Sequence, residues 1–298
     1  MASCFRLLAT LIPTLMNLTD RIYVAVHIAL SVLVCACYAE VAHGWRYLVW
    51  NAIAIAAIVF LSRNRHDGTG WEFVHDWLPL VFFITVFEEV SYLSLSLRGT
   101  WQNPWLVAWE SALFALPPGE WLRSCTSPWF RELLEFGYFS FYPLYPAAAG
   151  VLWAWRGRPK FAGAFRRLTD SLSVGYVVCY ALYLLFPTRS PSHNVGLNAI
   201  ASTQSGGPFH RMVRMIQGSA GVHGNAFPSA HIMLAFAVLV FAFRYFRRVA
   251  PWILLCNFLM CLGAVYDGYH YAVDVVAGAM LGIGAGVASV THKATGNR

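Results

Sequence analysis

Apolar stretches of membrane-spanning length recur along this 298-residue chain, each bounded by charged, proline or tryptophan positions. They cover residues 22–41, 45–61, 77–97, 132–155, 168–186, 228–246, 249–265 and 270–290. A transmembrane helix needs about 20 consecutive, mostly apolar residues. The pattern therefore predicts an all-α fold, a polytopic membrane helix bundle with about eight transmembrane helices. The first two stretches would also fit a single re-entrant pair.

Composition agrees with this fold class. Hydrophobic residues make up 58% of the chain and charged residues only 12%, and the mean hydropathy is +0.54, far above that of a soluble domain. The formal net charge of +7 is spread over short loops, where basic side chains usually set orientation and contact anionic lipid. We therefore expect no nucleic-acid partner.

The basic residues also predict the orientation in the membrane. With eight crossings, both termini and the loops after the second, fourth and sixth helices share one side, which carries 14 of the 21 lysines and arginines. Lysine and arginine favour cytoplasmic loops, so we expect cytoplasmic N- and C-termini. The loop 187–227 and the starts of the stretches at 228 and 270 then lie on the extracytoplasmic or lumenal side.

Ionisable residues stand at two of these helix starts. His270 and Asp274 open the last apolar stretch and, at a spacing of four, would share one helical face, so that the carboxylate holds and polarises the imidazole. Such groups are costly in a membrane and mark a functional site by default. His231 follows Pro228 and Ser229 at another helix start, where free N–H groups form an anion site.

Small residues continue the spacing of four along the last stretch. Gly278, Gly282 and Gly286 follow Asp274 at this interval. Such a stripe allows a neighbouring helix to approach closely, so we expect a tight helix–helix seam here.

The strings Phe-Pro-Ser-x-His at 227–231 and His-Tyr-x-x-Asp at 270–274, with Arg189 in the preceding loop, resemble the three-motif site of the type-2 phosphatidic acid phosphatase superfamily. They look most like the branch that contains the inositol phosphorylceramide synthases and sphingomyelin synthases. The resemblance covers roughly residues 77–290. It implies a six-helix lipid phosphatase or phosphotransferase core in residues 77–298, behind an N-terminal segment, residues 1–76, with two extra transmembrane helices.

The resemblance also implies a role for each motif residue. His270 would be the nucleophile that takes the phosphoryl group as a phosphohistidine, Asp274 its orienting partner, and His231 the acid that protonates the leaving alkoxide. The phosphate-binding residues would be Arg189, Ser229, Ala230, Asn225 and Tyr269. The substrate would be a membrane lipid, with a lipid alcohol as acceptor in the case of transfer. A histidine nucleophile needs neither metal nor cofactor, so we expect none.

The chain departs from the phosphatase pattern at three positions. Leu182 replaces a lysine before the first motif, Ala264 replaces an arginine before the third, and Ala230 replaces a glycine in the second. Two cations are therefore missing from the expected site. A less cationic pocket is better matched to a phosphodiester, or to a transferase, than to a phosphate monoester with nearly two negative charges.

Four further charged residues have open roles. Arg211 and Arg214, just before the second motif, either replace the missing cations or contact the loop or a headgroup. Glu88 and Glu89 lie in the middle of the third stretch, where they either line a headgroup cavity or form interior hydrogen bonds. Neighbouring carboxylates at this depth should keep one proton between them.

Three classes of function fit these features: an enzyme acting on a lipid phosphate, a transporter or scramblase with a path of histidines and glutamates, and a bis-histidine haem protein. The resemblance favours the enzyme. The position of His231 and His270 at helix starts, rather than mid-membrane, argues against haem ligation. Within that class hydrolysis is the commoner activity, whereas the motif departures favour phosphotransfer. Three loop histidines show no metal-ligand spacing: His193, His210 and His223. The oligomeric state is not predicted.

Overall fold

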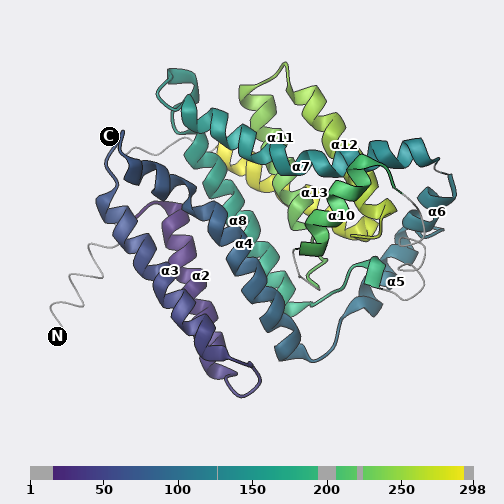
Figure 1. The fold of residues 1–298 in the computed structure, drawn as a ribbon, viewed down its shortest axis with the longest axis horizontal. Helices are drawn as coiled ribbons and strands as arrows, with labels where there is room; N and C mark the ends of the chain where they lie inside the picture. The colour runs from purple at the N-terminus through teal and green to yellow at the C-terminus, as the bar shows by residue number, and fades with distance from the viewer. Residues whose placement is uncertain (1–15, 126, 194–205, 220–223, 292–298) are drawn as a thin grey trace. The chain divides into compact units, whose positions relative to one another are not determined.

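The computed structural model describes residues 16–125, 127–193, 206–219 and 224–291. In these ranges every regular element is helical, which confirms the predicted all-α fold. The chain divides into two compact units, Met1–Gly99 and Thr100–Arg298, which are described separately (Figure 1).

Three long helices form the described part of the first unit: α2 (Leu18–Ala36), α3 (Gly44–Asn64) and α4 (Gly70–Arg98). Local capping sets several of their ends. The Asn17 side chain accepts from the Asp20 N–H at 2.8 Å, and the Asp20 carboxylate accepts from the Asn17 N–H in return. Gly99 ends α4 in the left-handed conformation, with φ of 67°. Each helix is long and apolar enough to cross a membrane.

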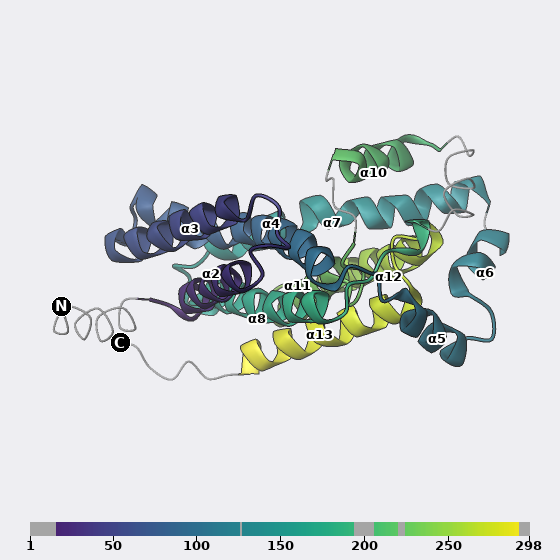
Figure 2. The same cartoon turned by 90° about the horizontal axis from the view of Figure 1, so that it is seen from below.

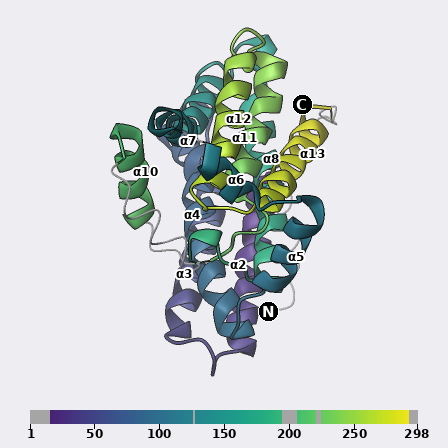
Figure 3. The ribbon, with the colours of Figure 1, turned by 90° about the vertical axis from the view of Figure 1, so that its right-hand side faces the viewer.

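The second unit contains the remaining described helices. They are α5 (Asn103–Leu113), α6 (Pro118–Cys125), α7 (Pro128–Ala154), α8 (Ala164–Leu185), α10 (Pro208–Ser219), α11 (Ala230–Tyr245), α12 (Ala250–Tyr266) and α13 (Ala272–Thr291). Short 3-10 turns cover Pro159–Phe161 and Pro191–His193. Helix α11 is central and packs against α7, α8, α12 and α13. Helix α10 lies along α7, on the side away from α13 (Figures 2 and 3).

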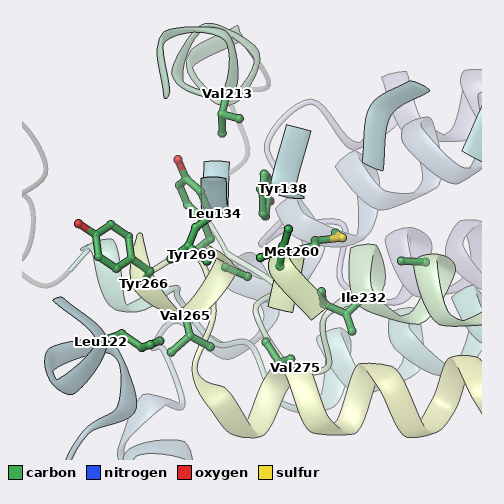
Figure 4. Packing of buried hydrophobic residues seen from close by; sticks show 13 residues of the cluster. Leu122, Leu134, Tyr138, Val213, Ile232, Met260, Val265, Tyr266, Tyr269 and Val275 are labelled. Carbon is green, nitrogen blue, oxygen red and sulfur yellow. The ribbon is translucent and has the colours of Figure 1, made fainter. Parts of the chain in front are cut away.

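Apolar side chains from several of these helices meet in one core cluster (Figure 4). Leu134 and Tyr138 of α7 lie with Ile232 of α11 and Met260 of α12, all at most 1% exposed. Val213, also in the cluster, brings in α10. This packing holds the starts of α11 and α13 in fixed positions relative to α7 and α12.

The glycine stripe of α13 forms the predicted seam with α11. A Cβ added at Gly278 would lie 2.5 Å from the Ser229 carbonyl oxygen, and one added at Gly286 would lie 2.9 Å from Val240 Cβ. Gly282 faces the backbone of Met233 in the same way. The expectation of a close helix approach is therefore confirmed.

All eight apolar stretches coincide with helices. Five helices of the described residues are long and apolar enough to span a membrane, and the last of these is α13; α11 and α12 are shorter apolar helices of 16 and 17 residues. Several apolar helices of this kind make the chain a membrane protein. The number of crossings stays a prediction.

The two compact units divide after α4, whereas the resemblance placed the start of the phosphatase-type core at residue 77, inside α4. The extent of that core stays a prediction. Hydrogen bonds tie α4 to the first unit. Asn51 of α3 donates to Glu89 Oε1 of α4 at 2.9 Å, and His75 Nε2 of α4 lies 3.1 Å from Asp20 Oδ1 of α2.

Candidate active site

The second motif fixes the start of α11. Ser229 is its N-cap, fully buried, and its Oγ accepts from the Ile232 N–H at 3.4 Å. The Tyr183 hydroxyl of α8 donates to the Pro228 carbonyl at 2.8 Å. The Ser229 N–H donates to the Asp274 carbonyl at 3.1 Å. The head of α11 is thus anchored to both α8 and α13.

The third motif lies partly ahead of its helix, which corrects the expectation of a shared helical face. Helix α13 begins at Ala272, so His270 belongs to the preceding segment. Asp274 Oδ2 reaches back to accept from the Tyr271 N–H at 2.8 Å, as a third-position carboxylate does in a capping box. His270 Nδ1 is 3.5 Å from Asp274 Oδ2, beyond a normal hydrogen bond.

Hydrogen bonds define the tautomer of His270. Its Nδ1 lies 3.1 Å from the Ala226 carbonyl oxygen, and its Nε2 lies 3.0 Å from Ser229 Oγ. A carbonyl only accepts, so Nδ1 carries the hydrogen, and the Nε2 lone pair accepts from the Ser229 hydroxyl. Burial lowers the pKa of His270 to about 4, against the opposing effect of the Ala226 hydrogen bond. The imidazole is therefore neutral at pH 7, with its Nε2 lone pair directed at the Ser229 hydroxyl.

Thr188 joins the loops of the first and second motifs. Its carbonyl accepts from the Ala226 N–H at 3.1 Å, and its Oγ1 accepts from the Phe227 N–H at 3.0 Å. Thr188 is fully buried. The residue next to it, Arg189, is in this way held close to the segment that contacts His270.

Asn103 and Trp101 position Arg189. Asn103 Oδ1 accepts from the Arg189 N–H at 2.8 Å, and Asn103 Nδ2 donates to the Arg189 carbonyl at 3.0 Å. The guanidinium lies over the Trp101 ring, 4.5 Å from its centre. Arg189 Nε is buried and has no hydrogen-bond partner among the described residues. Gly224, with φ of 149°, allows close approach to the same ring, since a Cβ there would lie 2.5 Å from Trp101 Cη2.

His231 lies in the first turn of α11 and is half-buried. Its ring is 5.0 Å from the ring of Phe141 and 6.5 Å from that of Tyr138, both on α7. It is near enough to His270 for two charged imidazoles to repel each other. The structure therefore brings the two motif histidines to one place.

Other residues of the predicted phosphate-binding set surround this place. Tyr269 precedes His270, and its ring lies 4.9 Å from the Tyr138 ring. Asn225 is buried in the left-handed conformation with φ of 60°. Ala230 is the first residue of α11. Their roles remain predictions.

The remaining predicted charges lie apart from the histidines. Arg211 and Arg214 are exposed on α10, and Arg211 Nε donates to the Gly206 carbonyl at 3.3 Å. Glu89 is buried and bonded to Asn51 inside the first unit, as expected for an interior hydrogen bond, whereas Glu88 is exposed. The suggested headgroup cavity stays a prediction.

Sequence reasoning did not identify three contacts of the site. Thr188 bonds the Phe227 N–H, Asn103 bonds the backbone of Arg189, and Tyr183 bonds the Pro228 carbonyl. The contact of Trp101 with the Arg189 guanidinium was also not predicted. No spacing signal relates Asn103 to Arg189, which lie 86 residues apart. His223, one of the loop histidines, lies outside the described residues.

The chain is helical and apolar, and two of its helices begin near a motif histidine. The loop that carries Arg189 is hydrogen-bonded to the segment ahead of α11. A known protein family shares this arrangement. Residues 104–288 match the family model of the PAP2 superfamily, and the chain therefore belongs to this superfamily. This matched range contains all the motif residues described above.

The chain is also similar to two curated proteins and to one solved structure. The chain is 30% identical over 105 residues to a PA-phosphatase related-family protein of Dictyostelium discoideum. It is 34% identical over 59 residues to the bacitracin transport permease protein BcrC of Bacillus licheniformis. These segments cover 34% and 20% of this chain, but only 19% and 29% of the two relatives. The crystal structure of Aquifex aeolicus LpxE aligns with 58% of this chain and 93% of its own, at 18% identity and a TM-score of 0.40.

Proposed function

We propose that this protein is an integral membrane enzyme that cleaves or transfers a phosphoryl group on a lipid, through a phosphohistidine, at the extracytoplasmic or lumenal face. One observation carries the proposal: the neutral His270 presents its Nε2 lone pair 3.0 Å from Ser229 Oγ at the head of α11. Membership of the PAP2 superfamily and the name of the Dictyostelium relative favour a lipid phosphate as substrate.

In the first step His270 Nε2 attacks phosphorus, and the bond from phosphorus to the lipid oxygen breaks. His231, in its protonated form, gives its proton to the leaving alkoxide. A positioned acid of this kind contributes about 10²–10⁴-fold to the rate. The Ala226 carbonyl, 3.1 Å from Nδ1, orients the ring, and Asp274 adds negative charge 3.5 Å away as the ring becomes cationic.

In the second step water attacks the phosphohistidine, His231 takes up the proton of that water, and the bond from phosphorus to Nε2 breaks. Inorganic phosphate then leaves, and both histidines return to their starting states. If the hydroxyl of a lipid alcohol takes the place of water, the same site acts as a transferase.

Charge stabilisation comes from Arg189 and the start of α11. Phosphoryl transfer depends mainly on positioning and on electrostatic stabilisation of the transferred group. The buried Arg189 Nε and the first-turn N–H groups of α11 supply donors for the non-bridging oxygens. The phosphate would displace the hydroxyl of Ser229 from Nε2 as it enters.

Phosphotransfer between lipids is the second candidate. Ala264 occupies the place of a family arginine; it is fully buried, and its carbonyl accepts from the His270 N–H at 3.1 Å. Leu182, in the place of a family lysine, lies half-buried on α8. A site lacking these two cations suits a phosphodiester headgroup donor, as in the synthase-like branch that the motifs resemble.

A product analysis tests the proposal. Detergent-purified protein is incubated with a panel of phospholipids and phosphorylated isoprenoids, with and without a lipid alcohol, and the products are separated. Release of inorganic phosphate indicates a phosphatase, and a new phospholipid formed only with the alcohol indicates a transferase. The absence of turnover under every condition would contradict the proposal and favour a transporter.

A further inference from the structure

A second polar cluster lies in the same unit, on the α10 side of the segment that contains His270. It consists of Glu135 from α7, His210 from α10 and Asp267 at the end of α12. Glu135 Oε1 is 2.6 Å from His210 Nδ1. One potential ligand atom from each of the three residues lies within 4.8 Å of the others. The phosphoryl-transfer steps proposed above use none of them.

Two carboxylate oxygens of this cluster are buried without a donor. Glu135 is fully buried and Asp267 half-buried. In the described part of the chain no N–H or O–H group reaches Glu135 Oε2 or Asp267 Oδ2, and the two carboxyl groups face each other closely enough to share either a proton or a metal ion. An unsatisfied buried carboxylate oxygen is costly, and more so next to a second one.

The charges around the cluster leave it one positive charge short. The groups within electrostatic range are Arg131, Arg214, Glu132, Glu135 and Asp267. Two guanidinium groups thus face three carboxyl groups. Glu132 is already engaged, because it accepts from the N–H groups of Gly207 and Phe209. The unmet negative charge therefore lies on Glu135 and Asp267.

We propose that Glu135, His210 and Asp267 form a binding site for a divalent transition-metal ion such as Zn²⁺ or Mn²⁺. One imidazole and two carboxylates are ligand types that these ions accept, and three protein ligands leave positions for water. Nδ1 of His210, which faces Glu135, is the ligand atom.

Arg131 would lie outside the coordination sphere. Its Nη2 lies over the edge of the imidazole, 3.0 Å from His210 Nδ1 and 3.2 Å from Nε2, so an ion bound at Nδ1 has to displace it and leaves the ring hydrogen on Nε2. The guanidinium then moves to a carboxylate oxygen, as an outer-shell partner that fixes a ligand.

The site would act as a clamp. It would join α7 and α10 to the end of α12, three residues before His270. A metal ion that binds the folded chain and not the unfolded chain stabilises the folded state. The ion has no part in the phosphohistidine chemistry, so the proposal stands or falls independently of that function.

The test uses full-length protein carrying a tag without histidines. The protein is stripped with a chelator, dialysed against Zn²⁺ or Mn²⁺ and then against metal-free buffer, and its metal content and thermal transition are measured. Glu135→Gln and Asp267→Asn remove a ligand charge. Glu120→Gln, an exposed carboxylate on α6, is the matched control.

We expect the wild type and Glu120→Gln to retain about one ion per chain and to unfold at a higher temperature with metal than without. The two ligand variants should retain less than a tenth as much, with no thermal response. If the wild type binds no more metal than these variants, the cluster holds a shared proton and the proposal is wrong. If Glu135→Gln fails to fold, the metal content of the wild type is compared with that of His210→Gln, and equal metal contents would show that the proposal is wrong.

Turnover of the stripped protein provides a second readout. Assayed below its transition temperature, it should match that of the metal-loaded protein within about twofold, because the ion only clamps the fold. If the metal-stripped protein stays folded but loses turnover, and Zn²⁺ restores the turnover, the purely structural role of the ion would be contradicted.

Discussion

Replacing Gly278 by alanine should disturb the catalytic site from the opposite side of the seam between α11 and α13. The added Cβ would lie 2.5 Å from the Ser229 carbonyl oxygen. An ordinary carbon–oxygen contact is about 3.3 Å, so the two backbones must separate by roughly 0.8 Å. Ser229 is the residue whose hydroxyl contacts His270 Nε2.

Gly284 provides the matched control for this substitution. It lies on the same helix, and a Cβ there would meet nothing within 4 Å. Alanine favours the helix over glycine by about 1 kcal/mol at both positions, so the difference between Gly278→Ala and Gly284→Ala isolates the clash. Overpacking of this kind costs about 1–3 kcal/mol, and each kcal/mol lowers the transition temperature by about 2–4 °C.

Thermal unfolding in detergent and single-turnover kinetics measure the two effects. We expect Gly278→Ala to unfold at a lower temperature than Gly284→Ala. It should also lose up to about 100-fold in turnover, the cost of misplacing a reacting group by about 1 Å. Equal stability and turnover in the two variants would refute the close approach of α13 to Ser229.

Further predictions concern the site residues and the orientation of the chain. Asp274→Asn removes the negative charge beside His270 and should reduce single-turnover rates by about 10²–10⁴-fold without unfolding; a loss below tenfold would remove Asp274 from the mechanism. Because burial lowers the pKa of His270 to about 4, the acid limb of kcat/KM should lie well below the ordinary histidine value, as protonation of Nε2 stops attack. His231→Ala should slow turnover, and its rate deficit should shrink for substrates with good leaving groups; an equal deficit for all leaving groups would contradict this role. A cysteine at Ser192 should react in intact cells with a membrane-impermeant thiol reagent, beyond the background of the native cysteines, whereas one at Ala162 should not; the reverse result would invert the predicted orientation.

Much of the fold could be predicted from the sequence because its signals are local. Long apolar stretches give the helices, and the spacing of Gly278, Gly282 and Gly286 gives the seam. The helix ends were less predictable. Asp274 caps the Tyr271 N–H, which ends the helical pattern short of His270 and replaces the expected partnership with a 3.5 Å separation.

Contacts between distant segments account for what the sequence did not reveal. Asn103 hydrogen-bonds the backbone of Arg189, which lies 86 residues away, and no periodic pattern in the sequence predicts such a pair. The cluster of Glu135, His210 and Asp267 also comes from three separate helical segments, so metal-ligand spacing was invisible in the sequence. Conversely, the motif strings identified both histidines because each lies at the start of its own apolar stretch.

Trapping the covalent intermediate tests the central claim most directly. Protein mixed with a radiolabelled lipid phosphate and quenched within one turnover should carry label that is stable to alkali, labile to acid and located on the peptide containing His270. His270→Ala should carry no label and should lose turnover while remaining folded. Label on another residue, or a His270→Ala protein keeping more than about a tenth of its activity, an effect of only ~1.4 kcal/mol on the barrier, would contradict the account.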